Sequence, residues 1–172
     1  MIRQLHHNLV TQGPSWLRFP AKLTPFSVKR ALLLNTLKTV CREALDDGEF
    51  EFLRHRWLRI SVTDLALEAF ISFDDDSLVV AQACERVDAS FSADANDLIL
   101  IAARREDPDT LFFQRRLNIE GDTELGLEVK NLMDGIDWSA LPAPLLGALS
   151  KFADFIEAGL SAGAEVQHVD QN

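Results

Sequence analysis

The fold of this chain is decided by residues 107–122, which read DPDTLFFQRRLNIEGD. The Asp-Pro pair at its start is typical of a helix beginning, because a proline at the first helical position removes no helical hydrogen bond. Leu117 and Ile119 alternate with polar residues and predict a short strand. Gly121-Asp122 then predicts a turn that caps a second helix, whose apolar positions are Leu125, Val129, Leu132 and Met133.

Upstream of this stretch, the spacing of apolar residues changes from helical to alternating. A helix is expected from an N-cap at Thr24 to about Asp46, stopping at Gly48, and a shorter piece at 49–54. From Trp57 onward, alternation predicts strands near 57–62, 67–73, 78–81 and 87–91. Asp94 is then expected to cap a helix through Ile99 and Ala102.

Together these elements predict an α+β fold. It consists of a single, mostly antiparallel, five-stranded sheet covered on one face by helices, with helical extensions at both ends. We expect an N-terminal arm over 1–23, the main domain over 24–135, a C-terminal helix over 136–163 and a disordered tail over 164–172. Within the arm, Gly13, Pro14 and Pro20 predict that no single continuous helix forms.

Composition narrows the classes of function. The 172 residues are 47% hydrophobic and 26% charged, which is typical of a globular protein. A net charge of −10 argues against a nucleic-acid binder. There is neither an apolar run long enough to cross a bilayer nor a secretory leader, so we expect a cytoplasmic protein.

The charge is unevenly distributed along the chain. Residues 1–43 carry seven basic residues and one acid, net +6, whereas the remainder is net −16. In the same basic segment, aromatic and basic residues are interleaved, namely Trp16, Arg18, Phe19, Lys22 and Phe26. Such a segment suits an anionic membrane surface, and it could equally pack on the acidic body of the protein.

Residues for catalysis or metal binding are not arranged in a known pattern. The four histidines, at positions 6, 7, 55 and 168, do not have the spacing of metal ligands or of a general base. The acidic runs at 46–51 and 74–76 lack the spacing of a calcium loop, and we interpret them as solvated turns. We therefore expect no catalytic residue, no metal and no cofactor, and a hydrolase or transferase using an acidic pair is disfavoured.

Residues 98–119 are rich in apolar side chains, and no catalytic pattern accompanies them. Covering one face of a sheet accounts for many of them, and lining a cavity for an apolar ligand is the alternative. The residue pattern does not choose between these readings.

The motif over 107–122, the helix ending at Leu132-Met133 and the step from strand to capped helix at 89–94 resemble the sterol carrier protein (type two) family. The likeness extends over about residues 40–135. Two further segments, 23–26 with 44–49 and 102–134, resemble a bacterial branch of that family that serves as accessory factors in oxygen-independent ubiquinone biosynthesis.

The resemblance implies a non-catalytic, lipid-binding, membrane-associated protein. Its implied partners are an isoprenoid quinone precursor, phospholipid or fatty acid, an anionic membrane surface and ubiquinone biosynthesis enzymes. The inward side chains of the matching elements are then the expected lipid contacts: Phe73, Val79, Phe91, Leu98, Ile101, Phe112, Leu117, Ile119, Leu125, Val129 and Met133. The competing interpretation is a scaffold with a filled interior that holds biosynthetic enzymes together without binding lipid.

Overall fold

The strands form one sheet in the order β3-β2-β1-β4-β5. The computed structural model describes residues 2–169, with side chains over 5–161 apart from positions 15 and 17. The strands are β1 (Leu58–Val62), β2 (Leu67–Asp74), β3 (Ser77–Ala81), β4 (Ala89–Ala93) and β5 (Leu117–Gly121). Only the β1–β4 pair is parallel among them, which confirms the mostly antiparallel sheet predicted from sequence.

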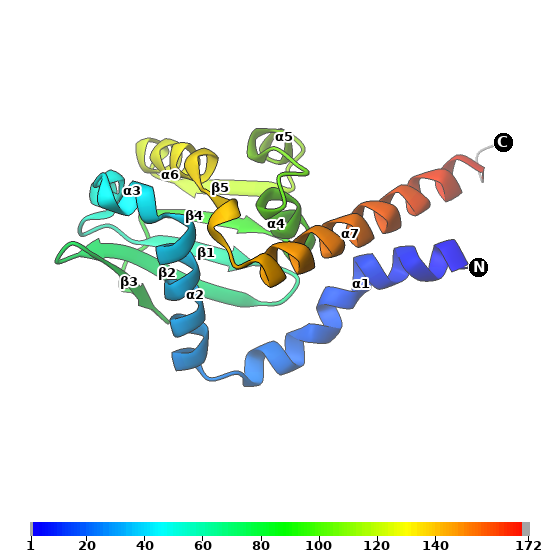
Figure 1. The fold of residues 1–172 in the computed structure, drawn as a ribbon, viewed down its shortest axis with the longest axis horizontal. Helices are drawn as coiled ribbons and strands as arrows, with labels where there is room; N and C mark the ends of the chain where they lie inside the picture. The colour runs from blue at the N-terminus through cyan, green and yellow to red at the C-terminus, as the bar shows by residue number, and fades with distance from the viewer. Residues whose placement is uncertain (1, 170–172) are drawn as a thin grey trace.

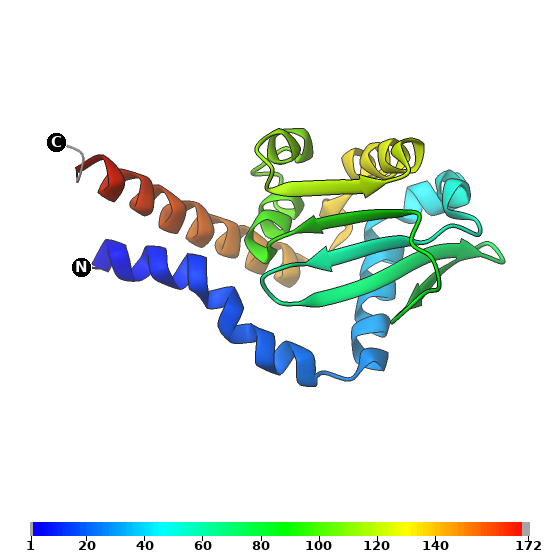
Figure 2. The same cartoon turned by 180° about the vertical axis from the view of Figure 1, so that it is seen from behind.

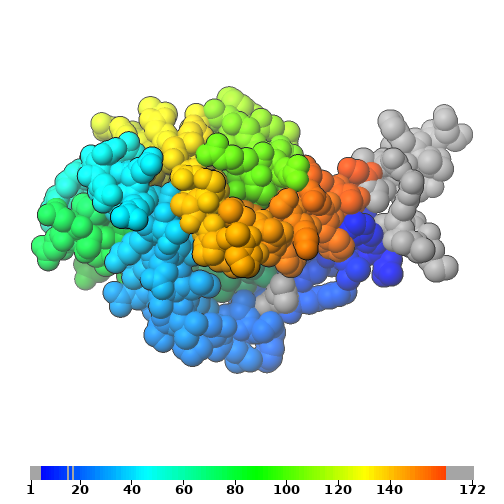
Figure 3. Space-filling model, in the orientation of Figure 1, coloured from blue at the N-terminus to red at the C-terminus, as the bar shows by residue number. Residues whose placement is uncertain are grey.

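Helices cover one face of this sheet, as predicted (Figure 1). They are α2 (Phe26–Val40), α3 (Arg42–Asp46), η1 (Glu49–Leu53), α4 (Ala95–Ala102), α5 (Pro108–Phe113), α6 (Thr123–Gly135), η2 (Trp138–Ala140) and α7 (Ala143–Val169). In the space-filling view, α2, α6 and α7 hide most of the sheet on this side (Figure 3). Figure 2 shows the opposite face with no helix across it.

The structure confirms two of the helix N-caps predicted from sequence. The side chain of Asp107 accepts a hydrogen bond from the Thr110 amide at 3.1 Å, and that of Asp122 accepts from the Leu125 amide at 2.9 Å. Asp94 does begin α4, but its carboxylate is held by the Thr63 hydroxyl instead of capping the helix. Asp64 takes over that role and accepts from the Ala95 amide at 3.0 Å.

The prediction of a single helix from Thr24 to Asp46 was wrong at its start and in its middle. Helix α2 begins at Phe26 with Pro25 as its N-cap and without a side-chain cap, while the Thr24 hydroxyl donates backward to the Pro20 carbonyl at 3.1 Å. The backbone leaves helical geometry at Cys41, which divides the segment into α2 and α3. The stop at Gly48 was correct, because this glycine adopts a left-handed φ of 74°.

The N-terminal segment corrects a second prediction. Residues Ile2–Leu23 form one helix, α1, although it contains Pro14 and Pro20. Pro14 has no N–H to donate to the Val10 carbonyl, and Asn96 of α4 donates to that carbonyl instead, at 2.7 Å. The helix therefore bends along its length (Figure 1) but does not end at its prolines.

Helix α1 lies beside α7 rather than forming a free arm. His6 and His7 donate to the carbonyl oxygens of Phe155 (3.0 Å) and Gly159 (3.1 Å). Gly159 allows this close approach, because a Cβ at this position would lie 2.3 Å from a methyl group of Val10. Helix α7 continues to Val169, past residue 163, where the C-terminal helix was predicted to end; residues 170–172 of the predicted tail lie outside the described residues.

Candidate functional site

A cavity of about 330 Å³ lies between the covered face of the sheet and its helices. This inner cavity is bounded by α2, η1, β1, β2, β4, β5, α4, α6 and η2. Its lining consists of Leu33, Thr36, Leu37, Val40, Cys41, Phe50, Leu53, Leu58, Ile60, Ser61, Val62, Ile71, Phe91, Ser92, Ala93, Leu98, Ile101, Leu117, Val129, Leu132, Met133, Ile136 and Trp138.

The strands and α2 create this space through their periodicity. Residues two apart on a strand share a face, so Phe91 and Ala93 of β4 both point inward, where Ala93 is paired with Leu117 of β5. From the other side, Leu33 and Leu37 lie one turn apart on α2 and face the sheet. The small side chain of Ala93 leaves room that a larger residue would fill.

The chemistry of the inner cavity is that of a hydrocarbon site. Its lining contains no charged side chain, and its polar side-chain groups are limited to Thr36, Ser61, Ser92, the thiol of Cys41 and the indole N–H of Trp138. Burial raises the pKa of Cys41 to about 11, so this thiol stays protonated and neutral near pH 7. The cavity therefore suits an apolar chain, because burying an unpaired charge would be very costly.

Six of the eleven side chains predicted as lipid contacts line the inner cavity. These are Phe91, Leu98, Ile101, Leu117, Val129 and Met133. Phe73 and Leu125 are buried in the surrounding core without lining the space. The prediction for Val79 was wrong, because pairing with Ser72 turns it to the uncovered face of the sheet, whereas Leu78 and Val80 point inward.

Sequence reasoning missed the contribution of α2, β1 and η2. Leu33, Leu37, Ile60 and Trp138 all line the cavity. All but Ile60 lie outside residues 40–135, the range of family likeness on which the site prediction relied. A signal was present in the helical spacing of α2 and in the alternation of β1. Applying the inward-facing rule to every element would have found Leu33, Leu37 and Ile60.

Phe112 and Ile119 line a second hollow, which we call the α5–α6 groove. It opens to the surface between α5, β5 and α6 and has a volume of about 390 Å³. Its lining also includes Phe113, Leu127 and, at its rim, Lys130. Lys130 pairs with Asp109 at 2.8 Å, and this hydrogen bond raises the pKa of the lysine.

The residues predicted to contact membrane divide into two groups. Trp16 and Phe19 are 65% and 72% exposed on one side of α1, and Lys22 is exposed nearby. Arg18 instead donates to the carbonyl oxygens of Asp64 (3.1 Å) and Thr63 (3.3 Å), which ties α1 to the turn after β1. Phe26 is half-buried and packs against the main core.

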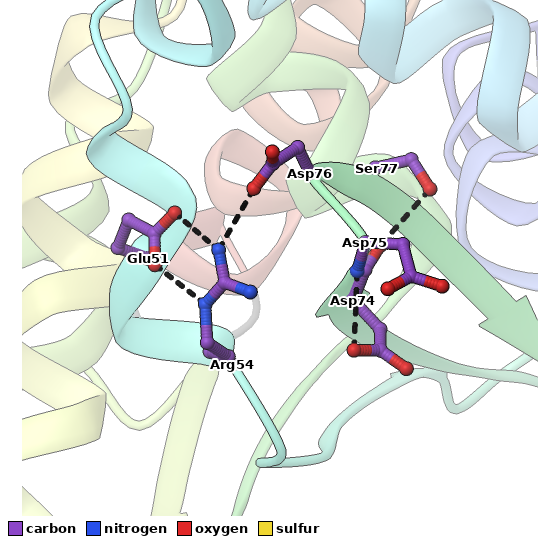
Figure 4. A network of polar contacts seen from close by, with 6 residues as sticks. All are labelled: Glu51, Arg54, Asp74, Asp75, Asp76 and Ser77. Carbon is purple, nitrogen blue, oxygen red and sulfur yellow. Dashed lines mark hydrogen bonds and ion pairs between the residues drawn. The ribbon is translucent and has the colours of Figure 1, made fainter.

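The acidic runs form a structural network around Arg54 (Figure 4). Its guanidinium donates two hydrogen bonds to Glu51, at 2.7 and 2.6 Å, and one to Asp76 at 2.8 Å. These bonds hold the pKa of Glu51 below its usual range. The Ser77 hydroxyl donates to the Asp74 carbonyl at 3.0 Å and closes the hairpin. The network joins η1 to the β2–β3 turn.

Over the residues whose side chains are described, no cluster of three histidine, cysteine or acidic residues is arranged to hold a metal ion. Within the same part of the chain, every helix is too short or too polar to span a bilayer.

Comparison with known proteins identifies the family. The model of the SCP-2 sterol transfer family matches residues 34–134, the segment that builds the sheet and most of the inner cavity. The chain belongs to the SCP-2 sterol transfer family. Two members from Escherichia coli, of strains K12 and O157:H7, are each named ubiquinone biosynthesis accessory factor UbiT. Each is 54% identical over 167 residues, covering 97% of this chain and 95% of the relative.

A solved structure of the SCP-2 type shares the fold. The protein titled UbiJ-SCP2 ubiquinone synthesis protein superposes with a TM-score of 0.52 at 19% identity, over 64% of this chain and 97% of its own. At this identity the likeness concerns the fold alone. The sequence-based assignment to the family is confirmed by the family model and by the identity to the two relatives.

Proposed function

We propose that this chain is a non-catalytic lipid-binding accessory factor of oxygen-independent ubiquinone biosynthesis. In this role the inner cavity holds the apolar chain of an isoprenoid quinone precursor or another membrane lipid. The observation that carries the proposal is the uncharged cavity of about 330 Å³ inside an SCP-2 fold. Ubiquinone biosynthesis is inferred from the two relatives that are named for it, and its oxygen-independent branch from the sequence resemblance given above.

The size of the cavity supports an occupied state. Empty space beside apolar side chains is destabilising, because the side chains around it lose the contacts that packed neighbours would make. An apolar guest removes this cost, whereas water gains few hydrogen bonds from such a lining. The cavity thus favours lipid binding over the alternative of a scaffold with a filled interior.

We further propose that α1 docks on an anionic membrane from the cytoplasmic side. Trp16, Phe19 and Leu23 share one face of the helix, and all three are exposed. Lys22 adds positive charge beside them, and Arg18 fixes the orientation of the helix relative to the domain. A lipid carrier held in this way meets both its ligand and the enzymes of the pathway at the bilayer surface.

Displacement of a fluorescent fatty acid in vesicle-free buffer tests lipid binding. Leu37→Asp places a charge in the cavity wall and should abolish binding. Leu32→Asp is the matched control, because Leu32 lies on the same helix but is 69% exposed. Equal binding by both variants, or no lipid found by native mass spectrometry of the gently purified protein, would contradict the proposal.

Sedimentation with phosphatidylglycerol vesicles tests docking separately. Combined Trp16→Ala and Phe19→Ala substitutions should reduce the bound fraction, and Lys22→Gln should reduce the effect of added salt. An unchanged bound fraction in both variants would remove α1 from the membrane contact while leaving the cavity proposal intact.

A further inference from the structure

The inner cavity and the α5–α6 groove share part of one wall. Phe91, Leu117 and Met133 line both hollows. Phe91 and Leu117 are buried on neighbouring strands, while Met133 is half-buried near the end of α6. Where these three side chains lie, an interior space of about 330 Å³ adjoins a surface groove of about 390 Å³.

Met133 is the side chain in this wall that can move at least cost. Methionine is unbranched and has three rotatable bonds beyond its Cα, so it adapts its shape to what lies beside it. The two strand residues are fixed by the sheet and by packing on both sides. A change of rotamer at Met133 would therefore join the two hollows without disturbing a strand.

The groove itself exposes more apolar surface than a free surface tolerates well. Phe113 is 81% exposed, and Phe112 and Leu127 beside it are exposed as well. Adjacent exposed aromatic and aliphatic side chains of this kind mark a surface that is covered in use. Their position across the shared wall from the cavity indicates what covers them.

The charges at the rim favour a hydrocarbon chain over an anionic headgroup. Lys130, the one basic side chain in the groove lining, is already neutralised by Asp109 at 2.8 Å. Glu120 and Asp122 add negative charge to the same rim. An anionic headgroup would meet net repulsion there, whereas an uncharged chain lies on the apolar floor.

We infer that an apolar chain too long for the inner cavity passes Met133 and continues into the α5–α6 groove. The two hollows then form one binding site for an elongated isoprenoid or acyl chain, and the groove sets its preference for chain length. This inference rests on the proposed lipid-binding function and adds to it a second compartment and a passage.

Binding of geraniol, farnesol and geranylgeraniol, measured by displacement of a fluorescent fatty acid, tests the inference. Affinity of the unmodified protein should rise at each step. Leu127→Asp and Phe113→Asp, at residues that line the groove but not the inner cavity, should bind geraniol as the unmodified protein does. Both should lose about tenfold or more for geranylgeraniol, the effect of leaving roughly 60 Å² of chain in water.

Leu145→Asp is the matched control. Leu145 is 55% exposed on α7 and lines neither hollow, while Leu127 is 56% exposed on α6 and lines the groove. This control should bind all three prenols normally. Retained binding of geraniol also serves as the test that each variant is folded.

The outcomes separate the inference from the proposal beneath it. If both groove variants bind geranylgeraniol as tightly as the unmodified protein, the chain does not enter the groove and the inference is wrong, although lipid binding stands. If the unmodified protein binds none of the prenols, the proposed function falls and the inference with it.

Discussion

Replacing Ala93 by phenylalanine tests whether the space beside this residue is empty or filled. The substitution should raise the free energy of unfolding if the space is empty and lower it if the space is filled. Ala93 is only 3% exposed, and its side chain points into the inner cavity. In lipid-free protein, a phenylalanine ring here would fill empty space and bury its apolar surface at a gain of about 1.5–3 kcal/mol. For a chain of this size, that gain corresponds to a rise of about 3–12 °C in Tm.

The same substitution four residues away provides the control. Ala89 lies on the same strand and the same face, is 1% exposed and lines no part of the cavity. Ala89→Phe must displace packed atoms and should cost about 1–3 kcal/mol. The two variants are thus expected to change stability in opposite directions.

Urea denaturation of delipidated protein, together with fatty-acid binding, measures both effects. Ala93→Phe should be more stable than the unmodified protein and should bind lipid about tenfold more weakly or worse, because its ring occupies the site. If Ala93→Phe destabilises the fold as much as Ala89→Phe does, the interior holds no usable space and the reasoning from cavity volume is refuted.

Three further outcomes are expected. Burial raises the pKa of Cys41 from 9.0 to about 11, so the thiol ionises at lower pH in the unfolded chain than in the folded protein. The free energy of unfolding should therefore fall by up to roughly 3 kcal/mol as the pH rises from 9 to 11. Urea titrations of Cys41→Ala should show a smaller fall over the same pH range. Gly121→Ala should lower the free energy of unfolding by about 3 kcal/mol or more in the same assay, because Gly121 has a φ of 103° and a Cβ there would lie 2.3 Å from the Asp88 carbonyl oxygen. Gly135→Ala is the control: a Cβ at Gly135 meets open space, so this substitution should be neutral or stabilising. Gly159→Val should free α1 from α7, seen as faster hydrogen exchange in α1, while Gly147→Val, with no atom near, should leave that exchange unchanged.

Local patterns predicted most of the fold because local physics decides it. Leu58, Ile60 and Val62 alternate since one face of their strand is buried, and Asp107 and Asp122 cap helices through contacts three residues away. Val79 was misassigned because it belongs to the continuous apolar run Leu78-Val79-Val80-Ala81, in which no alternation with polar residues shows which side chains face inward. The direction of the Val79 side chain is set by pairing with Ser72 on the neighbouring strand, and this pairing cannot be read from local sequence.

The remaining differences also depend on distant partners. The sequence contains a proline at position 14, but the amide of Asn96 that makes this proline tolerable comes from 82 positions further along the chain. Likewise, the inner cavity is a property of how α2, β4 and α6 pack together. Inward-facing residues can be read from periodicity, whereas the volume left between them cannot.

The pairing of α1 with α7 also bears on how the chain acquires its structure during synthesis. His7 and Gly159, which meet across this pair, are separated by 152 positions. Synthesis delivers α1 before the sheet and α7 after it, so the cluster that joins Val10 to Ala153 and Ile156 can be completed only after most of these residues have been made. The sheet can assemble earlier from its hairpins, which makes closure of the two end helices a late event in maturation.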